Sequence, residues 1–296
     1  MGFKPVRKAV LPVAGLGTRV LPATKVIPKE MLPVFDRPAL HYVIDEAREA
    51  GIEHFIFVTG RNKGAIEDYF DTAYELEATL EAKGKTALLD ELRADLPAAG
   101  ACSFVRQQAP LGLGHAVWCA RELVGDEPFA VMLPDMIMRS RPSCLADMVS
   151  AYTEAGGGNL ISVQDVPRSQ VSNYGIIDPG ARKGRLVEMR GMVEKPAVQD
   201  APSTLMISGR YILQPEIFGL LSRQTPGAGG EIQLTDAMQA LMASSAFHAL
   251  PFEGEIFDTG SKTGYLQAAA AMALADPEHG EQAREILRAL LDQSGG

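Results

Sequence analysis

Apolar residues in the first half of the chain form short runs that alternate with amphipathic segments. Val6–Val13 and Phe55–Thr59 are runs of strand length, and Ala39–Ala50 between them has the spacing of an amphipathic helix that ends at Gly51. The alternation continues through a helical stretch at 66–96 broken at Gly84, a strand at 102–107, a helix at 114–123 and a strand at 129–133. This order predicts a parallel sheet with crossover helices.

The pattern changes beyond Gly158, where short strand-like segments are separated by turn residues. These segments lie at 159–166, 174–180, 184–196 and 204–213. They predict mixed or antiparallel sheet joined to the parallel one. Further helices are expected at 235–243, 261–274 and 281–291. No repeat or low-complexity segment divides the chain, so we expect one α/β domain over residues 1–296.

Composition narrows the class of protein. The chain has 296 residues, 46% hydrophobic and 22% charged, which is typical of a globular protein. It has no apolar run of 18 residues and no signal-peptide pattern at its N-terminus, so we expect it in the cytoplasm. Cys102, Cys119 and Cys144 are far apart and in no CxxC pair, which predicts neither a disulfide framework nor a zinc site.

The charge balance argues against broad anionic partners. A net charge of -9 and a pI near 5.2 disfavour a nucleic-acid or membrane surface, because such surfaces need clustered cations. Positive charge for an anionic ligand must therefore be local. Arg19, Lys25 and Lys29 supply it in one stretch, with no acidic residue before Glu30.

That stretch follows the first strand and reads LPVAGLGTRVLPATKVIPKEMLP over residues 11–33. A dinucleotide-binding GxGxxG fails at Val20, a Walker loop is absent, and prolines at 22, 28 and 33 interrupt any long helix. Glycines let backbone N–H groups approach phosphate, while Arg19 and the lysines supply charge. The pattern suits a nucleoside triphosphate, although GxGTR alone is equally typical of a surface turn.

A second candidate feature is a pair of strand-end carboxylates. Asp135 ends the segment FAVMLPD and Asp258 ends FEGEIFD. Ligands of parallel α/β sheets collect outside the carboxyl ends of strands, so these two side chains are candidates to meet there. Either aspartate alone is also typical of a helix or turn cap.

The segment AGLGTRVLPATKVIPKEMLP resembles the nucleotide-binding signature of the sugar-nucleotide pyrophosphorylases, and its second half resembles the bacterial UTP:glucose-1-phosphate uridylyltransferases among them. Further matching segments follow in order: RQQAPLGLGHAV, SNYGIID, VEKP, GRYIL, GEIQLTDA and FDTGSKTGYL. The resemblance implies a Rossmann-like nucleotidyltransferase fold: a mixed, mainly parallel sheet with helices on both faces and a small antiparallel sugar-binding part. Residues 1–150 would mainly bind nucleotide, 151–275 mainly sugar phosphate, and 276–296 form a helical tail.

The resemblance also implies a site. The residues implied for the nucleotide are Ala14, Gly15, Gly17, Thr18, Lys25, Glu30, Gln107 and Gly112, with the Gln107 amide on the uracil edge. Those implied for the sugar phosphate are Tyr174, Gly175, Glu194 and Lys195. Arg19, Lys29 and Lys195 would be catalytic, and Asp135 and Asp258 would hold Mg2+. His115 is given no role.

The implied reaction is attack of glucose 1-phosphate on the α-phosphorus of UTP, giving UDP-glucose for polysaccharide and cell-envelope synthesis, with no protein nucleophile. A homotetramer or dimer is implied, with 66–96 and 281–291 as candidate contact surfaces. The alternatives are a deoxythymidylyl transferase for glucose 1-phosphate and a non-catalytic nucleotide sensor. A dehydrogenase is weaker, because its fingerprint fails at Val20.

Overall fold

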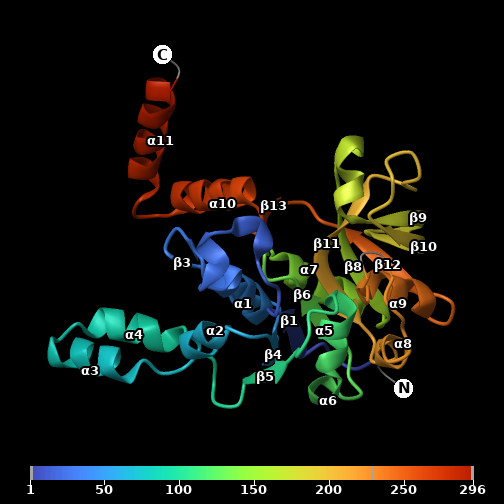
Figure 1. The fold of residues 1–296 in the computed structure, drawn as a ribbon, viewed down its shortest axis with the longest axis horizontal. Helices are drawn as coiled ribbons and strands as arrows, with labels where there is room; N and C mark the ends of the chain where they lie inside the picture. Colours follow the sequence, from blue (N-terminus) through green and yellow to red (C-terminus); the bar gives the residue numbers. More distant parts are fainter. Residues whose placement is uncertain (1–2, 228–229, 295–296) are drawn as a thin grey trace.

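A mixed sheet of nine strands organises the described residues, 3–227 and 230–294, of the computed structural model (Figure 1). Its strands in spatial order are β5 (Cys102–Arg106), β4 (His54–Thr59), β1 (Lys8–Pro12), β6 (Phe129–Met132), β11 (Leu205–Leu213), β8 (Asn159–Asp165), β12 (Phe247–Pro251), β10 (Leu186–Glu194) and β9 (Gly175–Lys183). The strands β5, β4, β1 and β6 are mutually parallel, whereas β11, β10 and β9 pair antiparallel with their neighbours. The predicted change from parallel to mixed sheet is confirmed, and the antiparallel strands continue the same sheet.

Helices cover both faces of this sheet, as the sequence predicts. Along β1, Val10 packs into one apolar cluster with residues of α5 (Leu113–Cys119), α8 (Ile217–Leu221) and α9 (Leu234–Leu241). Its neighbours Ala9 and Leu11 pack into a second cluster with α1 (Ala39–Glu49) and α7 (Cys144–Glu154). Successive strand residues point to opposite faces, so a central strand buried on both must be apolar throughout.

Several elements lie outside the sequence prediction. Segments that were not predicted include α7, α8, β12 and β7 (Met136–Arg139). Strand β7 pairs with β13 (Glu255–Asp258) in a separate two-stranded sheet. The stretch 66–96 is three helices, α2 (Gly64–Tyr69), α3 (Tyr74–Ala82) and α4 (Thr86–Ala94). The additional break follows Tyr69 because Phe70 turns inward and stacks on Phe57 of β4, with ring centroids 5.2 Å apart.

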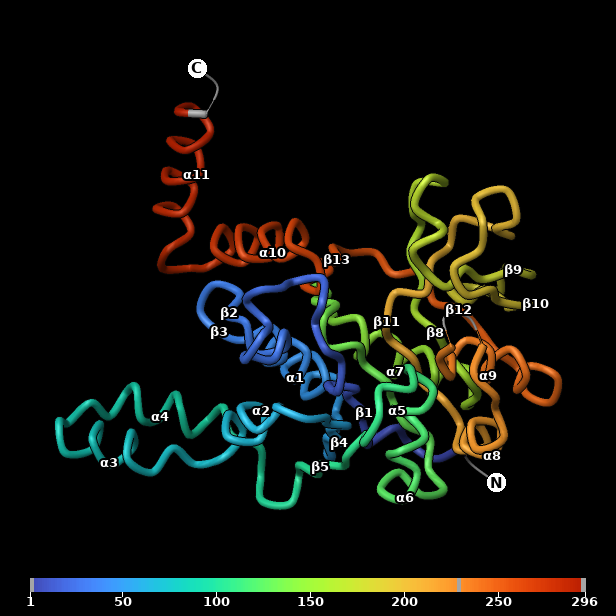
Figure 2. Tube along the Cα trace, in the orientation of Figure 1, coloured from blue at the N-terminus to red at the C-terminus, as the bar shows by residue number. Residues whose placement is uncertain are grey.

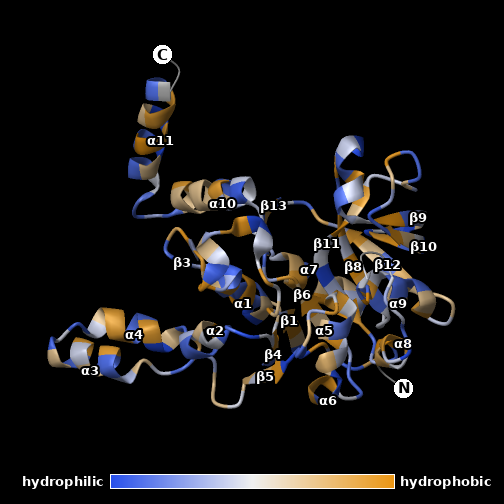
Figure 3. Cartoon of the chain, viewed as in Figure 1, coloured by the Kyte–Doolittle hydropathy of each residue, from blue (hydrophilic) through white to orange (hydrophobic). Residues whose placement is uncertain are grey.

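Two helical extensions project from the body (Figures 1 and 2): the α3–α4 hairpin, and α11 (Gly280–Ser294), which follows α10 (Lys262–Ala275). Apolar and polar residues are mixed along both extensions (Figure 3), and their exposed apolar side chains include Tyr74, Leu76, Leu88, Ile286 and Leu290. No helix in the described part of the chain is long and apolar enough to cross a membrane.

The segment after β1 forms no long helix, as its prolines predict. It contains three single 3-10 turns, η1 (Thr18–Val20), η2 (Ala23–Lys25) and η3 (Lys29–Met31), followed by a small hairpin of β2 (Pro33–Val34) and β3 (Arg37–Pro38). A fourth 3-10 segment, η4 (Arg168–Asn173), precedes β9. The short turns allow Arg19 and Lys29 to return to the carboxyl end of the sheet.

Candidate active site

The glycine turn after β1 is packed closely on the rest of its loop. Gly17 has φ of 67°, in the left-handed region, and its carbonyl accepts a hydrogen bond of 2.7 Å from the Thr24 hydroxyl. A Cβ at Gly17 would lie 3.2 Å from the Thr24 side chain and 3.3 Å from Lys29. Glycine is therefore required by both backbone conformation and space, and it keeps the Lys29 stem directly beside the turn.

Four charged side chains meet where the strands end. Lys29 Nζ lies 2.6 Å from Asp135 Oδ2, and Arg19 contacts Asp258 Oδ2 at 3.1 Å and Asp135 Oδ2 at 3.6 Å. Asp135 follows β6 and Asp258 ends β13, so the two carboxylates converge on one arginine although they are far apart in sequence. The structure thus brings together the two predicted metal ligands and two of the three predicted catalytic cations.

The pair of Asp135 and Lys29 is held in its charged state. Burial would raise the pKa of Asp135, but the charge and hydrogen bond of Lys29 together with Arg19 hold that pKa below its usual value. Burial would likewise lower the pKa of Lys29, but Asp135 and Glu30 raise it. The pair therefore remains an ion pair at neutral pH.

Gly260 completes the cluster and was not predicted. Its N–H donates to Asp258 Oδ1 at 2.9 Å. A Cβ at this position would lie 2.5 Å from Arg19 Nη2, 2.8 Å from Asp135 Oδ2 and 2.9 Å from Asp258 Oδ1. The three charged groups can therefore approach one another only because position 260 has no side chain. The only sequence signal for this role was a glycine directly after FDT.

A cavity of about 370 Å³ lies between the glycine turn and the start of α5. Predicted nucleotide residues that line it are Ala14, Gly15, Gly17, Thr18, Gln107 and Gly112. Gln107 is buried and donates from Nε2 to the Gly112 carbonyl at 3.1 Å. Gly112 has φ of 103°, and a Cβ there would lie 2.7 Å from the Ile232 carbonyl oxygen. Position 112 therefore has no room for a side chain, and the wall of the cavity at this position is formed by backbone.

Lys25 and Glu30 lie elsewhere. Lys25 lines a separate cavity of about 100 Å³ together with Gly15, Arg61 and Lys63. Glu30 is 1% exposed, and one oxygen accepts from Lys63 Nζ at 2.7 Å while Oε1 has no partner among the described residues. Burial raises the pKa of Glu30, opposed by Lys63 and Lys29. Its carboxylate faces the interior, and Lys63 is the partner that sequence analysis missed.

The predicted sugar-phosphate residues lie together at the adjoining ends of β9 and β10, where Gly175 pairs with Glu194. Glu194 Oε2 accepts from the Thr235 hydroxyl at 2.7 Å, and a Cβ at Gly175 would lie 3.1 Å from the same oxygen. Lys195 has φ of 45°, unusual for a residue with a side chain, and its N–H donates to the Tyr174 carbonyl at 3.0 Å. Thr235 was not predicted and holds the Glu194 carboxylate.

Lys195 is directed to solvent, with 59% of its side chain exposed and Nζ 3.6 Å from Glu194 Oε1. Burial raises the pKa of Tyr174, and the charge of Asp258 raises it further while Arg19 lowers it. The Tyr174 hydroxyl therefore stays uncharged at neutral pH.

The family model described as nucleotidyl transferase matches residues 8–274. The chain belongs to this family. The resemblance found in the sequence is confirmed, and with it the α/β class of the fold.

Curated relatives of this nucleotidyl transferase match along nearly all of the chain. It is 51% identical over 260 residues to the UTP–glucose-1-phosphate uridylyltransferase of Komagataeibacter xylinus, covering 88% of this chain and 91% of the relative. It is 49% identical over 291 residues to that of Bacillus subtilis strain 168, covering 98% and 99%. A solved structure of UTP-bound UGPase from Acinetobacter baumannii superposes with a TM-score of 0.88 at 46% identity, covering 95% and 98%.

Nucleotidyl transferases generally use a divalent metal ion. Asp135 and Asp258 fit such an ion, because both offer only carboxylate oxygens, which hard cations prefer. No group of three or more His, Cys, Asp or Glu side chains in the described residues could hold a metal by itself. Two protein carboxylates leave the remaining positions for water and phosphate oxygens, the arrangement typical of Mg2+ sites that bind with a nucleotide.

A buried arginine holds the turn that carries Asp135. Arg210 of β11 is fully buried and pairs with Glu46 of α1, with contacts of 2.7 and 3.0 Å. Its guanidinium also donates to the carbonyls of Leu133 at 3.1 Å and Met136 at 2.7 Å, on either side of Asp135. The only sequence signal was an arginine inside the apolar run TLMISGRYIL.

The carbonyl of Asp135 is held in addition by Thr259. Thr259 donates to the Asp135 carbonyl from its N–H at 2.8 Å and from its hydroxyl at 3.0 Å. The aspartate that carries the nucleotidyl transferase's candidate metal site is thus fixed by residues of two distant segments, and its side chain has little freedom to move away from Lys29.

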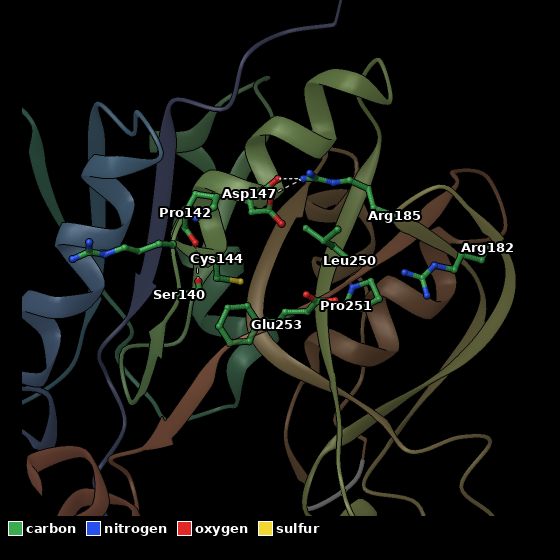
Figure 4. A pocket seen from close by; sticks show the side chains of 11 residues that line it. Ser140, Pro142, Cys144, Asp147, Arg182, Arg185, Leu250, Pro251 and Glu253 are labelled. Carbon is green, nitrogen blue, oxygen red and sulfur yellow. Dashed lines mark hydrogen bonds and ion pairs between the residues drawn. The ribbon is translucent and has the colours of Figure 1, made fainter. Parts of the chain in front are cut away.

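Another cavity, of about 300 Å³, lies outside the predicted site (Figure 4). Arg185, Asp147, Arg182, Cys144 and Glu253 are among the residues that line it, and Arg185 contacts Asp147 Oδ1 at 2.7 Å. None of the residues predicted for substrate or metal lines this cavity.

Proposed function

We propose that this nucleotidyl transferase transfers a uridylyl group from UTP to glucose 1-phosphate, giving UDP-glucose and pyrophosphate. The observation that carries the proposal is the Asp135 and Asp258 pair held on Arg19 and Lys29, beside a cavity lined by Gln107. The names of the curated relatives support UTP and glucose 1-phosphate as the substrates of this site.

In this reaction a phosphate oxygen of glucose 1-phosphate attacks the α-phosphorus of UTP, and the bond to the β-phosphate oxygen breaks. Two anions must approach each other, so the protein acts by positioning and by neutralising charge. Arg19 and Lys29 hold the pyrophosphate that leaves, and Lys195 holds the attacking phosphate. Asp135 and Asp258 would hold Mg2+, which would supply further neutralisation of phosphate oxygens when bound.

The remaining residues orient the two substrates. Gln107 and the backbone of Gly112 contact the uracil edge, and the backbone at Ala14 and Gly15 supports the same base. Gly17 and Thr18 lie beside the triphosphate. These assignments are supported by the cavity that all six residues line. The base is therefore read by a fixed wall, and the phosphates lie toward the charged cluster.

Tyr174, Gly175 and Glu194 take the sugar. The Glu194 carboxylate accepts hydrogen bonds from sugar hydroxyls. The hydrogen bond from Thr235 supports this role, because it fixes the orientation of that carboxylate. Lys25 contributes charge near the triphosphate from the neighbouring cavity. For Glu30 an indirect role fits better than a nucleotide contact, because its buried ion pair with Lys63 supports the Lys29 turn.

We further infer a homotetramer or dimer located in the cytoplasm. The α3–α4 hairpin and α11 each carry several exposed apolar side chains, which supports self-association because apolar side chains that gather on one surface commonly mark an interface. Light scattering of the purified chain measures the assembly directly; a monomer at micromolar concentration would exclude it.

Pyrophosphate release tests the function. The assay pairs UTP, dTTP, CTP, ATP or GTP with glucose 1-phosphate or mannose 1-phosphate, with and without Mg2+. Fastest release with UTP and glucose 1-phosphate is expected. A preference for dTTP would move the activity to a deoxythymidylyl transferase, and nucleotide binding without release from any pair would favour a sensor.

A further inference from the structure

One polar side chain beside the base cavity has no role in the proposed reaction. His115, in the first turn of α5, lies with Nδ1 3.0 Å from Gln107 Nε2. It is half-buried, its ring stacks near Trp118 with centroids 5.9 Å apart, and Cys119 Sγ is 3.9 Å from the same Nδ1. The contact of interest is therefore the one with Gln107.

Two acceptors fix which way the Gln107 amide faces. The Gly112 carbonyl can only accept a hydrogen bond, so the amide atom 3.1 Å from it must be the nitrogen Nε2. The second hydrogen of Nε2 is then directed to His115 Nδ1, which accepts it when that ring nitrogen carries no proton. Both amide hydrogens are thus taken by the protein.

The other end of the amide is left for a ligand. Among the described residues no donor bonds Gln107 Oε1, and this oxygen is not a buried atom without a partner. Gln107 lines the cavity between the glycine turn and α5. The cavity therefore presents an acceptor, and a base fits it best by presenting a donor at the same place.

We propose that His115 is a positioning residue for base selection: by accepting from Gln107 Nε2 it leaves only Gln107 Oε1 to face the base, and so favours uracil over cytosine. Uracil carries an N3–H donor, whereas cytosine N3 is an acceptor. An acceptor facing an acceptor leaves two desolvated groups unpaired, which disfavours CTP on the order of tenfold to a hundredfold. This inference rests on the proposed role of Gln107 with UTP.

The proton on His115 controls the arrangement. Burial lowers the pKa of His115, so the ring is neutral at pH 7, and the 3.0 Å contact with Gln107 Nε2 requires the tautomer whose single proton is on the ring Nε2, which leaves Nδ1 to accept. Titratable or charged groups around it are Cys119 on its own helix, Arg106 of β5, and Arg121 and Glu122 of α6 (Arg121–Val124). In acid a proton on Nδ1 would oppose the Nε2 hydrogen, and the Gln107 amide would lose this contact and with it its fixed orientation toward the base.

Substitutions at His115 separate positioning from packing. The measured quantity is the ratio of kcat/KM for UTP to that for CTP, with glucose 1-phosphate as acceptor. His115→Leu removes the acceptor and should lower the ratio about tenfold or more. His115→Asn can place its side-chain oxygen near the position of Nδ1 but does not titrate, so its ratio should stay within about twofold of wild type at pH 7.

The chain offers a matched control in His54, which is half-buried on β4, bonds the Ser103 hydroxyl at 2.8 Å and also has a pKa lowered by burial. His54→Leu removes a comparable histidine contact on another part of the sheet and should leave the ratio unchanged. A general loosening of the fold would instead lower turnover of UTP and CTP together in both variants, with no change in their ratio.

The pH profile gives a test that needs no folded Leu variant. Because the pKa of His115 is lowered by burial, the wild-type ratio should stay level near pH 7 and fall as the pH drops below about 6.5, while the His115→Asn ratio stays flat. The triphosphate is common to both nucleotides, so its own titration cancels in the ratio.

The outcomes separate this inference from the proposed function. An unchanged ratio in His115→Leu, or a wild-type ratio independent of pH, overturns the role of His115 even if UTP is turned over rapidly. Absence of pyrophosphate release by wild type would contradict the proposed function instead. The same ratio would then be measured as Kd for UTP against CTP, with the same expectations for each variant.

Discussion

Replacing Gly260 by alanine should damage the reaction while leaving the fold nearly intact. The added Cβ would lie 2.5 Å from Arg19 Nη2, 2.8 Å from Asp135 Oδ2 and 2.9 Å from Asp258 Oδ1. Ordinary contacts of a Cβ begin near 3.4 Å, so these atoms must withdraw by about 0.5 to 0.9 Å. Arg19 can swing into solvent, since 60% of its side chain is exposed. The carboxylates have less freedom.

The size of the effect follows from how firmly those carboxylates are held. Asp258 Oδ1 accepts from the Gly260 N–H itself, and Asp135 is bonded by Lys29, so both must break or stretch short contacts to move. A misplacement approaching 1 Å at a reacting centre costs on the order of a hundredfold in rate. We therefore expect kcat/KM of Gly260→Ala to fall roughly fiftyfold to a hundredfold, about 2.5 kcal/mol.

The assay is pyrophosphate release at several Mg2+ concentrations, with thermal unfolding measured on the same samples. Gly219→Ala is the control, because Gly219 lies inside α8 with nothing within 4 Å of an added Cβ, and should be stabilising by a few tenths to about 1 kcal/mol with unchanged turnover. Near wild-type turnover in Gly260→Ala would refute the reasoning, as it would show that the carboxylate positions are not needed.

The remaining predictions concern charged groups. Lys195→Ala should keep the fold, because the side chain is exposed, but lose about 3 kcal/mol of transition-state stabilisation; kcat/KM within twofold of wild type would reject its role. Asp135→Asn should abolish Mg2+-dependent turnover, and an unchanged Mg2+ titration would rule out that ligand. Because the pKa of Asp135 is lowered in the fold, its pairing with Lys29 stabilises above about pH 3.9; the stability gap between wild type and Asp135→Asn should shrink in urea titrations at more acidic pH. Arg210→Met should lower the free energy of unfolding by about 3 to 5 kcal/mol, because Glu46 is left buried and unpaired. The double variant Glu46→Met with Arg210→Met should recover most of this stability in denaturation. It should not recover turnover, since the carbonyls beside Asp135 have lost their donors.

Much of the fold could be predicted because its central strands have a local hydrophobic pattern that identifies them. The buried centres of β1 and β4 and all of β6 are apolar, which is the signature of strands buried on both faces, and α1 between β1 and β4 is amphipathic. The break after Tyr69 was not predictable in the same way. It depends on Phe70 packing against Phe57 of β4, a contact between two elements that the hydrophobic periodicity of one segment does not reveal.

The same distinction applies to the site. Arg19 and Lys29 belong to a dense motif, and the structure places both on the strand-end aspartates. Arg210 and Thr235 act from distant segments, one in a mainly apolar strand and one in an amphipathic helix, and local sequence does not identify their partners Glu46 and Glu194. Glu30 was assigned from its motif alone, without the buried Lys63 that explains it.

The charge pattern explains how an acidic chain can hold two anionic substrates. Lys29 is largely buried, and a buried cation without a partner would cost several kcal/mol, so before substrate arrives it must be paired, as it is with Asp135. Under the proposed function, phosphate oxygens can become the partners of Arg19 and Lys29 while a divalent ion becomes the partner of the two carboxylates. No charge in the cluster is left unpaired in either state. A net charge of -9 is compatible with this exchange because the cations that matter are paired within the site and are not spread over the surface.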